Sequence, residues 1–472
     1  MVDSAGHPTT APAVVAGRGA AAYLDRYNAP ILSDDDTVVR HSPPEPLAHG
    51  DARDMGDIKD GSVALVVTAP PAFVGPYEIT EPGDPAVLDG YVAYMDMLRD
   101  VFAECVRVLE PGGRMAVNVA NLGRKPYRSL SADVIGLLQD DLGLLIRGEV
   151  IWMKARGAGS NCAWGSYRSP KNPVLRDVTE RVILAGKGRF DRAVDAASRK
   201  AAGLPHAITL TSDEFQEATL DFWEIPPEAA SEVDHPSPFP VALPQRLVEL
   251  YTYADDLVLD PFMGSGTTAV AAVRSGRRFA GYDVDPGHVA TARRRVEAEQ
   301  AAHAGRVDDP VTLAFHEARV RGSAMRKLLA EVLAEVGFTG IREEAKVAKV
   351  SLVAPAAARD ASGRRWLFEM SGAFTVVPTG LDWVDAALAA VGRGAVIAGA
   401  TGEPPILFVP QLPEPKSPVD VILRAAGPSA LFDVVEVFSP EGRRRLARYA
   451  SGTVNSPLPG FWTEKEVAVE AS

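Results

Sequence analysis

The stretch LVLDPFMGSGTTAV at 257–270 constrains the fold more than any other part of the sequence. Its apolar start predicts a buried strand that ends at Asp260, and the turn through Gly264 and Gly266 opens a helix at Thr267. Glycines let a backbone approach a ligand closely, and the free N–H groups of a helix start face that ligand. The segment therefore predicts a ligand-binding turn at the edge of an α/β sheet.

A second acidic residue narrows the range of ligands that this turn could bind. The next predicted strand, FAGYD, ends in Asp283, where a carboxylate can accept hydrogen bonds from both hydroxyls of a ribose. The turn lacks the Gly-x-Gly-x-x-Gly spacing of a dinucleotide site and the Gly-Lys-Ser/Thr of a phosphate loop. A ligand with a ribose and an amino-acid part but no pyrophosphate is expected, and S-adenosylmethionine fits. Asp260 would bind its ammonium group and Asp283 its ribose.

Strands and helices alternate through residues 38–303, which predicts a wound, largely parallel sheet with helices on both faces. A glycine pair alone would be weak support for a site, because tight strand–helix turns also use glycine for packing. The strands are expected within 61–70, 114–120, 144–154, 179–187, 256–262 and 278–285, and the helices at 88–110, 131–143, 243–252, 267–276 and 286–300.

The chain divides into five expected parts. These are a disordered tail (1–37), the α/β domain (38–303), a linker helix (304–322), a smaller C-terminal α/β domain (323–455) and a C-terminal tail (456–472). In the second domain, helices are predicted at 324–337 and 381–392, and strands at 346–354, 364–374, 395–399 and 405–410.

Composition indicates a water-soluble globular chain in a reducing compartment. The 472 residues are 46% hydrophobic and 24% charged, and no apolar run reaches the ~18 residues of a membrane span. Cys105 and Cys162 are the only cysteines, which excludes a disulfide framework and a cysteine zinc site. The amino terminus lacks the pattern of a signal peptide, so a cytoplasmic location is expected.

The net charge of −13 argues against a surface coated in positive charge, but three basic islands stand out. They are GRKPYR (123–128), KARGAGSNCAWGSYRSPKNP (154–173) and GRRRLAR (442–448). Each alone is more typical of a solvated loop or helix face than of a nucleic-acid site. The first two follow the ends of sheet strands, where α/β sites lie, and we expect them to line a DNA cleft.

The segment DPFMGSGTT resembles the cofactor motif of the beta class of amino-DNA methyltransferases, which modify cytosine N4 or adenine N6. Those enzymes are circularly permuted: a Ser/Asp/Asn-Pro-Pro-aromatic catalytic motif precedes the cofactor motif, as APPA at 69–72 does here. GDARDM (50–55), LEPGGRMAVNV (109–119) and HPSPFPVALPQRLVELYT (235–252) match adjoining family segments. The resemblance covers roughly residues 38–300, with its motifs in the family's order.

This resemblance implies a Rossmann-like fold, S-adenosylmethionine as cofactor, double-stranded DNA as substrate and a target base flipped out of the duplex. It implies cofactor contacts from Asp51, His235, Phe239, Asp260, Phe262, Gly264, Gly266, Thr267, Thr268 and Asp283. The catalytic segment would be Ala69, Pro70, Pro71, Ala72 and Phe73, and the DNA contacts Arg124, Lys125, Arg128, Lys154, Arg168 and Lys171. No metal is expected.

Ala69 and Ala72 depart from the family motif. Ala69 offers no acceptor for the target amine and Ala72 no ring for the base, and these losses are on the order of 1.5–3 and 1–3 kcal/mol. Decay, a variant chemistry and a deliberate catalytic knockout compete as explanations. The intact cofactor motif and both prolines favour the knockout of a Ser-Pro-Pro-Tyr-type site. Thr68 before it suggests an original serine and hence cytosine N4. A DNA-binding protein with a relic cofactor pocket is the alternative.

The second domain carries a faint resemblance to the metal-binding hairpin of restriction-endonuclease-like nucleases. Glu369 occupies the glutamate position, but Ser371 replaces the lysine and Ser351 the aspartate. Because a catalytic metal here needs at least two carboxylates, cleavage is not expected. DNA recognition and packing or dimerisation stay open as roles for this domain, as do a homodimer and a companion restriction or defence protein.

Overall fold

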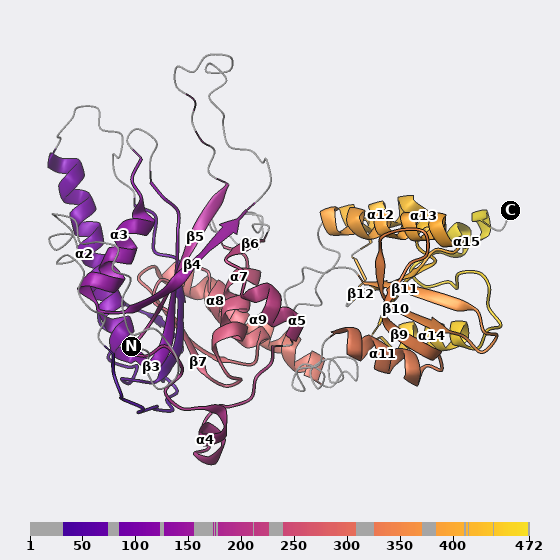
Figure 1. Ribbon diagram of the computed structural model, residues 1–472. Coiled ribbons are helices and arrows are strands. Elements are labelled where there is room, and N and C mark those ends of the chain that lie inside the picture. Colours follow the sequence, from indigo (N-terminus) through magenta and orange to yellow (C-terminus); the bar gives the residue numbers. More distant parts are fainter. Residues whose placement is uncertain are drawn as a thin grey trace, which may run out of the picture.

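The computed structural model describes residues 32–73, 85–122, 127–154, 173, 175, 178–210, 212–225, 239–307, 325–370, 384–409, 412–413, 415–437 and 439–470. These residues form two sheets, one of eight strands and one of five (Figure 1). Among them, no helix is long and apolar enough to span a membrane.

The first sheet has the order β1-β8-β7-β2-β3-β5-β4-β6. Its strands are β1 (Leu47–His49), β2 (Val63–Thr68), β3 (Leu109–Val119), β4 (Leu145–Met153), β5 (Thr179–Gly186), β6 (Phe222–Glu224), β7 (Leu257–Asp260) and β8 (Arg278–Asp283). Neighbours from β1 to β3 are parallel, and β5 runs antiparallel between β3 and β4. This mixed α/β arrangement confirms the expected Rossmann-like sheet.

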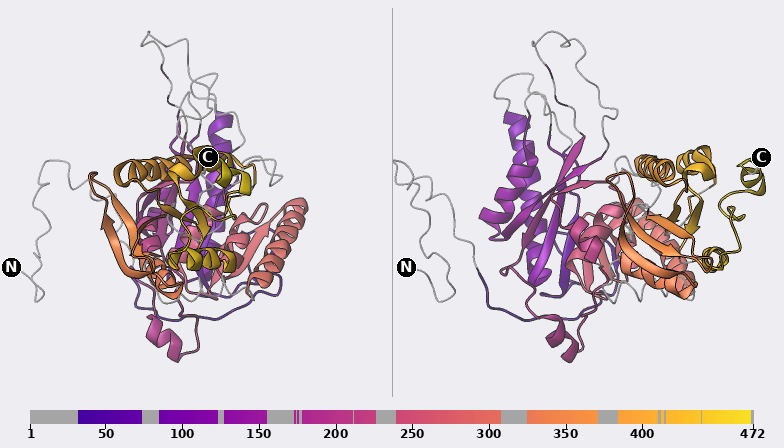
Figure 2. Two further views of the ribbon diagram at one scale, coloured as in Figure 1. Left: turned by 90° about the vertical axis from the view of Figure 1, so that its right-hand side faces the viewer. Right: turned by 45° about the vertical axis from the view of Figure 1, so that its right-hand side comes forward.

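Helices cover both faces of this sheet, with α2 on one face and α7, α8 and α9 on the other (Figures 1 and 2). The bounds are α2 (Pro85–Val108), α3 (Leu130–Gly136) continued by a π-helical turn η1 (Leu137–Asp141), α4 (Ala196–Ala201), α5 (Ser212–Ala218), α7 (Ala242–Tyr251), α8 (Thr267–Arg274) and α9 (Pro286–Val307). Each helix interval predicted in this domain therefore contains a helix.

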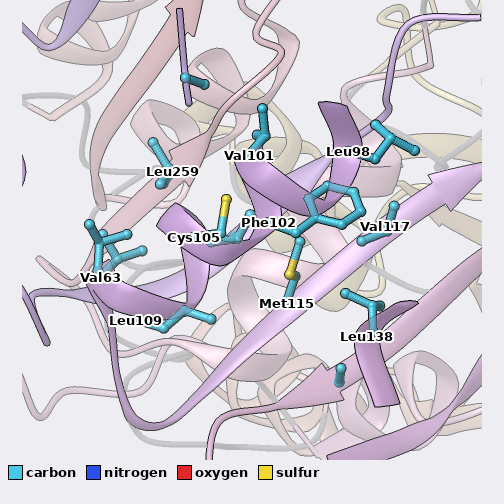
Figure 3. Packing of buried hydrophobic residues seen from close by; sticks show 14 of the residues in the cluster. Val63, Leu98, Val101, Phe102, Cys105, Leu109, Met115, Val117, Leu138 and Leu259 are labelled. Atoms are coloured by element: carbon cyan, nitrogen blue, oxygen red, sulfur yellow. The ribbon is translucent and has the colours of Figure 1, made fainter. Parts of the chain in front are cut away.

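The residues of β2 divide between two cores, with an irregularity in the register between Val63 and Leu65. Val63 and Val66 join a core with the α2 residues Leu98, Phe102 and Cys105, whose spacing of three to four residues places them on one side of the helix (Figure 3). Residues Leu65 and Val67 face the opposite way and pack in the core that includes Leu243, Leu247 and Val248 of α7. Strand β2 is thus buried on both sides, and only its carboxyl end leads out to the surface.

The second sheet has the order β13-β12-β11-β10-β9. Strands β9 (Thr339–Lys346), β10 (Val353–Arg359) and β11 (Arg365–Met370) are antiparallel, and β12 (Ile406–Val409) and β13 (Asp433–Glu436) continue in parallel with β11. The helices are α11 (Met325–Glu335), α12 (Val384–Thr401), α13 (Pro418–Ala430), α14 (Pro440–Ala450) and α15 (Glu464–Glu470).

Two predicted strands of this domain are wrong. The predicted strand at 346–354 spans the end of β9, the turn after it and the start of β10. The pattern of apolar residues runs on through this turn, so the pattern alone did not show that one strand ends and another begins there. The predicted strand at 395–399 lies inside α12, where Ala387, Ala390 and Ile397 are buried at helical spacing. A short apolar run fits either structure by periodicity alone, and here the packing of a longer helix decided.

The expected C-terminal tail, 456–472, is also corrected. Phe461 and Trp462 are buried in a core cluster of the second domain, and Arg424 of α13 pairs with Glu466 of α15 at 2.8 Å. Two large aromatic side chains bury enough apolar surface to hold this segment against the sheet. Residues 1–31 and most of the expected linker helix lie outside the described residues, although α9 reaches Val307.

Candidate functional site

The predicted cofactor and catalytic residues meet at one edge of the first sheet. Strands β1, β8, β7 and β2 are consecutive neighbours and parallel, so their carboxyl ends lie together. These ends carry, in sheet order, Asp51 just beyond β1, Asp283 at the end of β8, Asp260 at the end of β7 and Ala69 just beyond β2. The sheet order therefore places the double proline beside the strand that opens the glycine turn.

Asp260 is the most buried of these groups, with 2% of its surface exposed. Its Oδ1 accepts hydrogen bonds from the Thr68 hydroxyl at 2.7 Å and the Phe262 amide at 3.1 Å, and its Oδ2 accepts one from the Thr268 hydroxyl at 2.7 Å. Burial raises the pKa of this carboxyl to about 6, against the lowering effect of those donors. The carboxylate ties β2, the turn and α8 together.

The glycine turn has the backbone geometry that the sequence demanded. Gly264 and Gly266 have positive φ angles of 49° and 81°, a region that glycine occupies without steric cost. A Cβ at Gly266 would lie 2.8 Å from the Cβ of Ala292 on α9, so any larger residue would push the turn away from that helix. The turn therefore requires glycine for its conformation and for its packing.

Asp283 holds the other side of the turn. Its Oδ2 accepts a hydrogen bond from the Gly264 amide at 2.9 Å, and its Oδ1 accepts one from the Asp285 amide at 2.9 Å. His288 lies 3.3 Å from the same Oδ1. The Asp283 side chain is only 12% exposed, and both of its carboxylate oxygens accept hydrogen bonds from the loop backbone.

The two threonines of the motif point inward. Thr268 is buried and bonded to Asp260, and the buried Thr267 hydroxyl accepts a hydrogen bond from Arg295 at 3.1 Å. Their side chains thus shape the turn. Within it, the Gly264 amide donates to Asp283 at 2.9 Å and the Gly266 amide to the Met263 carbonyl at 2.8 Å. No local sequence pattern indicated Arg295, because it lies on a different element.

The remaining predicted cofactor residues differ in their surroundings. Asp51 is paired with Arg53 at 2.5 Å, and hydrogen bonding to that guanidinium holds the pKa of the Asp51 carboxyl below its usual value. Phe262 packs partly buried against the core on the α2 side, and Phe239 against the core that contains Leu243. His235 lies outside the described residues.

The double-proline segment is anchored by aromatic residues of α2. Ala69 and Pro70 are half-buried, whereas Pro71 and Ala72 are exposed. The Tyr94 hydroxyl donates a hydrogen bond to the Pro71 carbonyl at 3.0 Å, and the Phe73 ring lies 5.5 Å from the Tyr94 ring between centroids. Phe73 also meets the Tyr91 ring edge-on at 5.6 Å. The ring that the sequence offers at position 73 is therefore held in an aromatic cluster beside the segment.

Two of the predicted DNA-binding residues are described, and both are paired with acids. Arg128 donates from Nε to Asp133 at 2.6 Å and lies 5.4 Å from the Tyr91 ring centroid, and the Tyr91 hydroxyl donates to the same Asp133 at 2.6 Å. Lys154 pairs with Glu180. The other four, Arg124, Lys125, Arg168 and Lys171, lie outside the described residues.

The third basic island, 442–448, forms most of α14 and is largely neutralised by acids. Arg443 pairs with Glu335 at 3.0 Å, and Arg444 with Glu441 at 2.6 Å. Arg445 is buried against Asp433 at 3.5 Å. Arg445 therefore belongs to the internal packing of the second domain, whereas Arg444 and Arg448 are exposed on α14.

On the two strands of the nuclease-like hairpin, β10 and β11, Glu369 is the only acid, and it is internally paired. Glu369 is 2% exposed, and Arg393 of α12 lies 3.0 Å from it. Strand β10, which pairs with β11, reads VAPAAAR and contributes no carboxylate opposite Glu369. Ser351, the position expected for a metal-binding aspartate, lies in the turn before β10. In this hairpin Glu369 therefore serves an ion pair with the helix that covers the sheet.

Comparison with known proteins covers the part of the chain that contains these strand ends. Residues 63–294 match the family model described as DNA methylase. The chain is 27% identical over 275 residues to the Type II methyltransferase M.MjaI of Methanocaldococcus jannaschii, covering 51% of this chain and 86% of that protein. It is 25% identical over 268 residues to the DNA adenine methyltransferase YhdJ of Escherichia coli, covering 53% and 82%.

Among solved structures, the chain is similar to the M1.HpyAVI–SAM complex. The sequence identity is 20%, the TM-score is 0.36, and the match covers 52% of this chain and 97% of that one. The family-model match, residues 63–294, contains every strand of the eight-stranded sheet except β1 and none of the five-stranded sheet.

Proposed function

Residues 63–294 carry an S-adenosylmethionine-dependent DNA methyltransferase, and we propose that it acts on the exocyclic amine of a base flipped out of the duplex. The observation that supports this proposal best is the adjacency of β2 and β7. It places the double proline directly beside the glycine turn, which are the two parts that a base and a methyl donor would need.

The charge of the site suits this cofactor. Asp51, Asp260 and Asp283 stand at neighbouring strand ends, and the cofactor carries positive charge at its sulfonium and its ammonium. We propose that Asp283 binds the ribose hydroxyls. Asp260 attracts the ammonium end through its charge while its oxygens stay bonded to Thr68, Thr268 and the turn. Phe262, Phe239 and His235 would border the bound cofactor.

The chemistry assigns a clear role to the double proline. The lone pair of an exocyclic amine is delocalised into the ring, so the amine is a poor nucleophile until its N–H groups are hydrogen-bonded. The Pro70 carbonyl can accept one of those bonds. When bound, S-adenosylmethionine would supply the methyl group to this nitrogen, and the proton that the nitrogen loses would pass to solvent.

Two functions are missing from the motif itself. Ala69 supplies no second acceptor and Ala72 no stacking ring, so we propose that this chain is catalytically impaired and represents a disarmed Ser-Pro-Pro-Tyr-type site. Phe73, held by Tyr91 and Tyr94, is the ring best placed to support the flipped base. Together the two losses correspond to a rate deficit on the order of a hundredfold to ten-thousandfold.

The target amine is proposed as cytosine N4 rather than adenine N6. The basis is Thr68 before the motif, which suggests serine as the residue that Ala69 replaces. The adenine methyltransferase of Escherichia coli is a relative that keeps adenine N6 as the competing target. The second domain is proposed to contribute DNA recognition or dimerisation. Companion restriction proteins are suggested by the Type II methyltransferase M.MjaI.

The test is tritium transfer from labelled S-adenosylmethionine to amplified, unmodified duplex DNA. The Ala69→Ser/Ala72→Tyr double variant should transfer label at least a hundredfold faster than the chain as given, with unchanged cofactor affinity. The same double variant carrying Asp283→Ala is the matched control and should lose transfer. A double variant that binds cofactor and DNA but transfers nothing would favour the alternative, a non-catalytic DNA-binding protein. Equal rates in the given chain and the double variant would disprove the disarmed site.

A further inference from the structure

Arg295 of α9 reaches across to the glycine turn and makes three hydrogen bonds there. Its Nη1 donates to the Ser265 carbonyl at 2.9 Å, to the Ser265 hydroxyl at 2.8 Å and to the Thr267 hydroxyl at 3.1 Å. Ser265 and Thr267 are buried, with 6% and 4% of their surfaces exposed. One guanidinium nitrogen therefore binds both sides of the left-handed Gly266.

This position is electrostatically unusual for a cation. Helix α8 begins at Thr267, and the amino end of a helix carries partial positive charge, which disfavours a neighbouring arginine. The three hydrogen bonds to Ser265 and Thr267 are part of what stabilises the guanidinium in this position. A residue placed against the helix dipole is better explained by what it holds in place than by general surface solubility.

The same face of α9 also packs against the turn. Ala292, three residues before Arg295, lies where a Cβ at Gly266 would come within 2.8 Å. On the opposite side, the Asp283 carboxylate accepts the Gly264 amide. The turn is thus held between Asp283 of β8 on one side and Ala292 with Arg295 of α9 on the other.

We propose that Arg295 is a positioning residue for the cofactor: it fixes the turn from Ser265 to Thr267 in its bound conformation before the cofactor arrives. The inference rests on the proposed cofactor site and adds a residue to it. A preformed turn loses less conformational freedom on binding than a mobile one, and the saved entropy appears as affinity. Arg295 therefore acts on binding without touching the reacting atoms.

The chain offers a matched control between the same two helices. Arg274 of α8 pairs with Glu299 of α9 at 3.0 Å and is the last residue of α8, at the end opposite the turn. Replacing Arg274 with glutamine should loosen the contact between the helices without disturbing the turn. A purely structural role of Arg295 would give the two variants the same behaviour.

The experiment uses the full chain and S-adenosylmethionine itself. Arg295→Met keeps the aliphatic stem and removes the donors, and we expect the dissociation constant from isothermal titration to rise about tenfold or more. Arg295→Lys should fall between the wild type and Arg295→Met, and Arg274→Gln should bind like the wild type. In Arg295→Met, hydrogen exchange should be faster at the amides of residues 265–267. Without cofactor, the unfolding midpoint of Arg295→Met should not fall further than that of Arg274→Gln.

Four outcomes would overturn the inference. Unchanged affinity in Arg295→Met, or an equal loss in Arg274→Gln, would refute the positioning role while leaving the cofactor site intact. If Arg295→Met does not fold, the test falls to Arg295→Lys. Wild-type affinity in Arg295→Lys, together with wild-type hydrogen exchange at residues 265–267, would count against the positioning role. Absence of binding by the wild-type chain would refute the cofactor site itself, and the inference with it.

Discussion

The hydroxyl of Thr68 donates a 2.7 Å hydrogen bond to the carboxylate of Asp260, joining the last residue before the catalytic segment to the last residue before the cofactor turn. Both residues are buried, and they lie far apart in the chain. Through Asp260, the bond also reaches Thr268 of α8. The two halves of the site are therefore coupled by side chains that need not touch either substrate.

Replacing Thr68 with valine tests this coupling. Valine keeps the shape but removes the hydroxyl, so the buried carboxylate loses one of its donors, and the free energy of unfolding should fall by about 1–3 kcal/mol. Chemical denaturation followed by tryptophan fluorescence measures the change. Thr68→Ser keeps the donor and should cost clearly less. Equal stability of Thr68→Val and the wild type would show that this bond does not support the fold.

The raised pKa of Asp260, about 6, predicts a pH dependence of cofactor binding. A cationic ligand favours the ionised carboxylate, so affinity for S-adenosylmethionine should be full above pH 6 and fall on the order of tenfold per pH unit below it. In the cofactor-free chain the raised pKa acts in the opposite sense. Its contribution to stability is present below about pH 4 and is lost as the pH rises through 6.

Isothermal titration between pH 5 and pH 8 checks this prediction. In Asp260→Asn the affinity should be lower and nearly independent of pH across that interval, because the titrating carboxyl is gone. A wild-type profile that is equally flat would contradict the assigned role of Asp260.

Substitutions at Asp283 should separate its two contacts. Asp283→Asn keeps an oxygen that can accept the Gly264 amide but weakens binding of ribose hydroxyls, whereas Asp283→Ala removes both. We expect a graded loss of cofactor affinity, about tenfold for Asn and more for Ala. Asp285→Asn, two residues further along and exposed, is the matched control and should bind normally. Indistinguishable losses in Asn and Ala would mean that the Gly264 contact is unimportant.

The basic loop 123–128 gives a prediction about salt. If Arg124 and Lys125 contact phosphates, their joint replacement by glutamine should reduce the slope of log affinity against log salt by about 1.8 for duplex DNA. Arg128 is already paired with Asp133. Replacing Arg128 with glutamine should therefore change the salt slope less than replacing Arg124 or Lys125 with glutamine. Electrophoretic or anisotropy titrations over a range of salt measure both. An unchanged slope in the double variant would remove this loop from the DNA cleft.

The sequence determined those features that are local along the chain. Apolar periodicity determined the α/β alternation of the first domain, and the requirement for positive φ determined glycine at 264 and 266. The strand-ending acids Asp260 and Asp283 could be identified in the same way, because a carboxyl strand end followed by a turn is a local pattern. The departure at Ala69 and Ala72 is likewise visible in the letters alone.

Only the tertiary structure decided which groups meet. The order of the strands brought Thr68 to Asp260, and α9 brought Arg295 to the turn, because hydrogen-bond partners distant in sequence leave no periodic trace. Packing also decided that residues 395–399 continue a helix and that Phe461 and Trp462 belong to a core, since short apolar segments fit more than one structure until a partner surface is present.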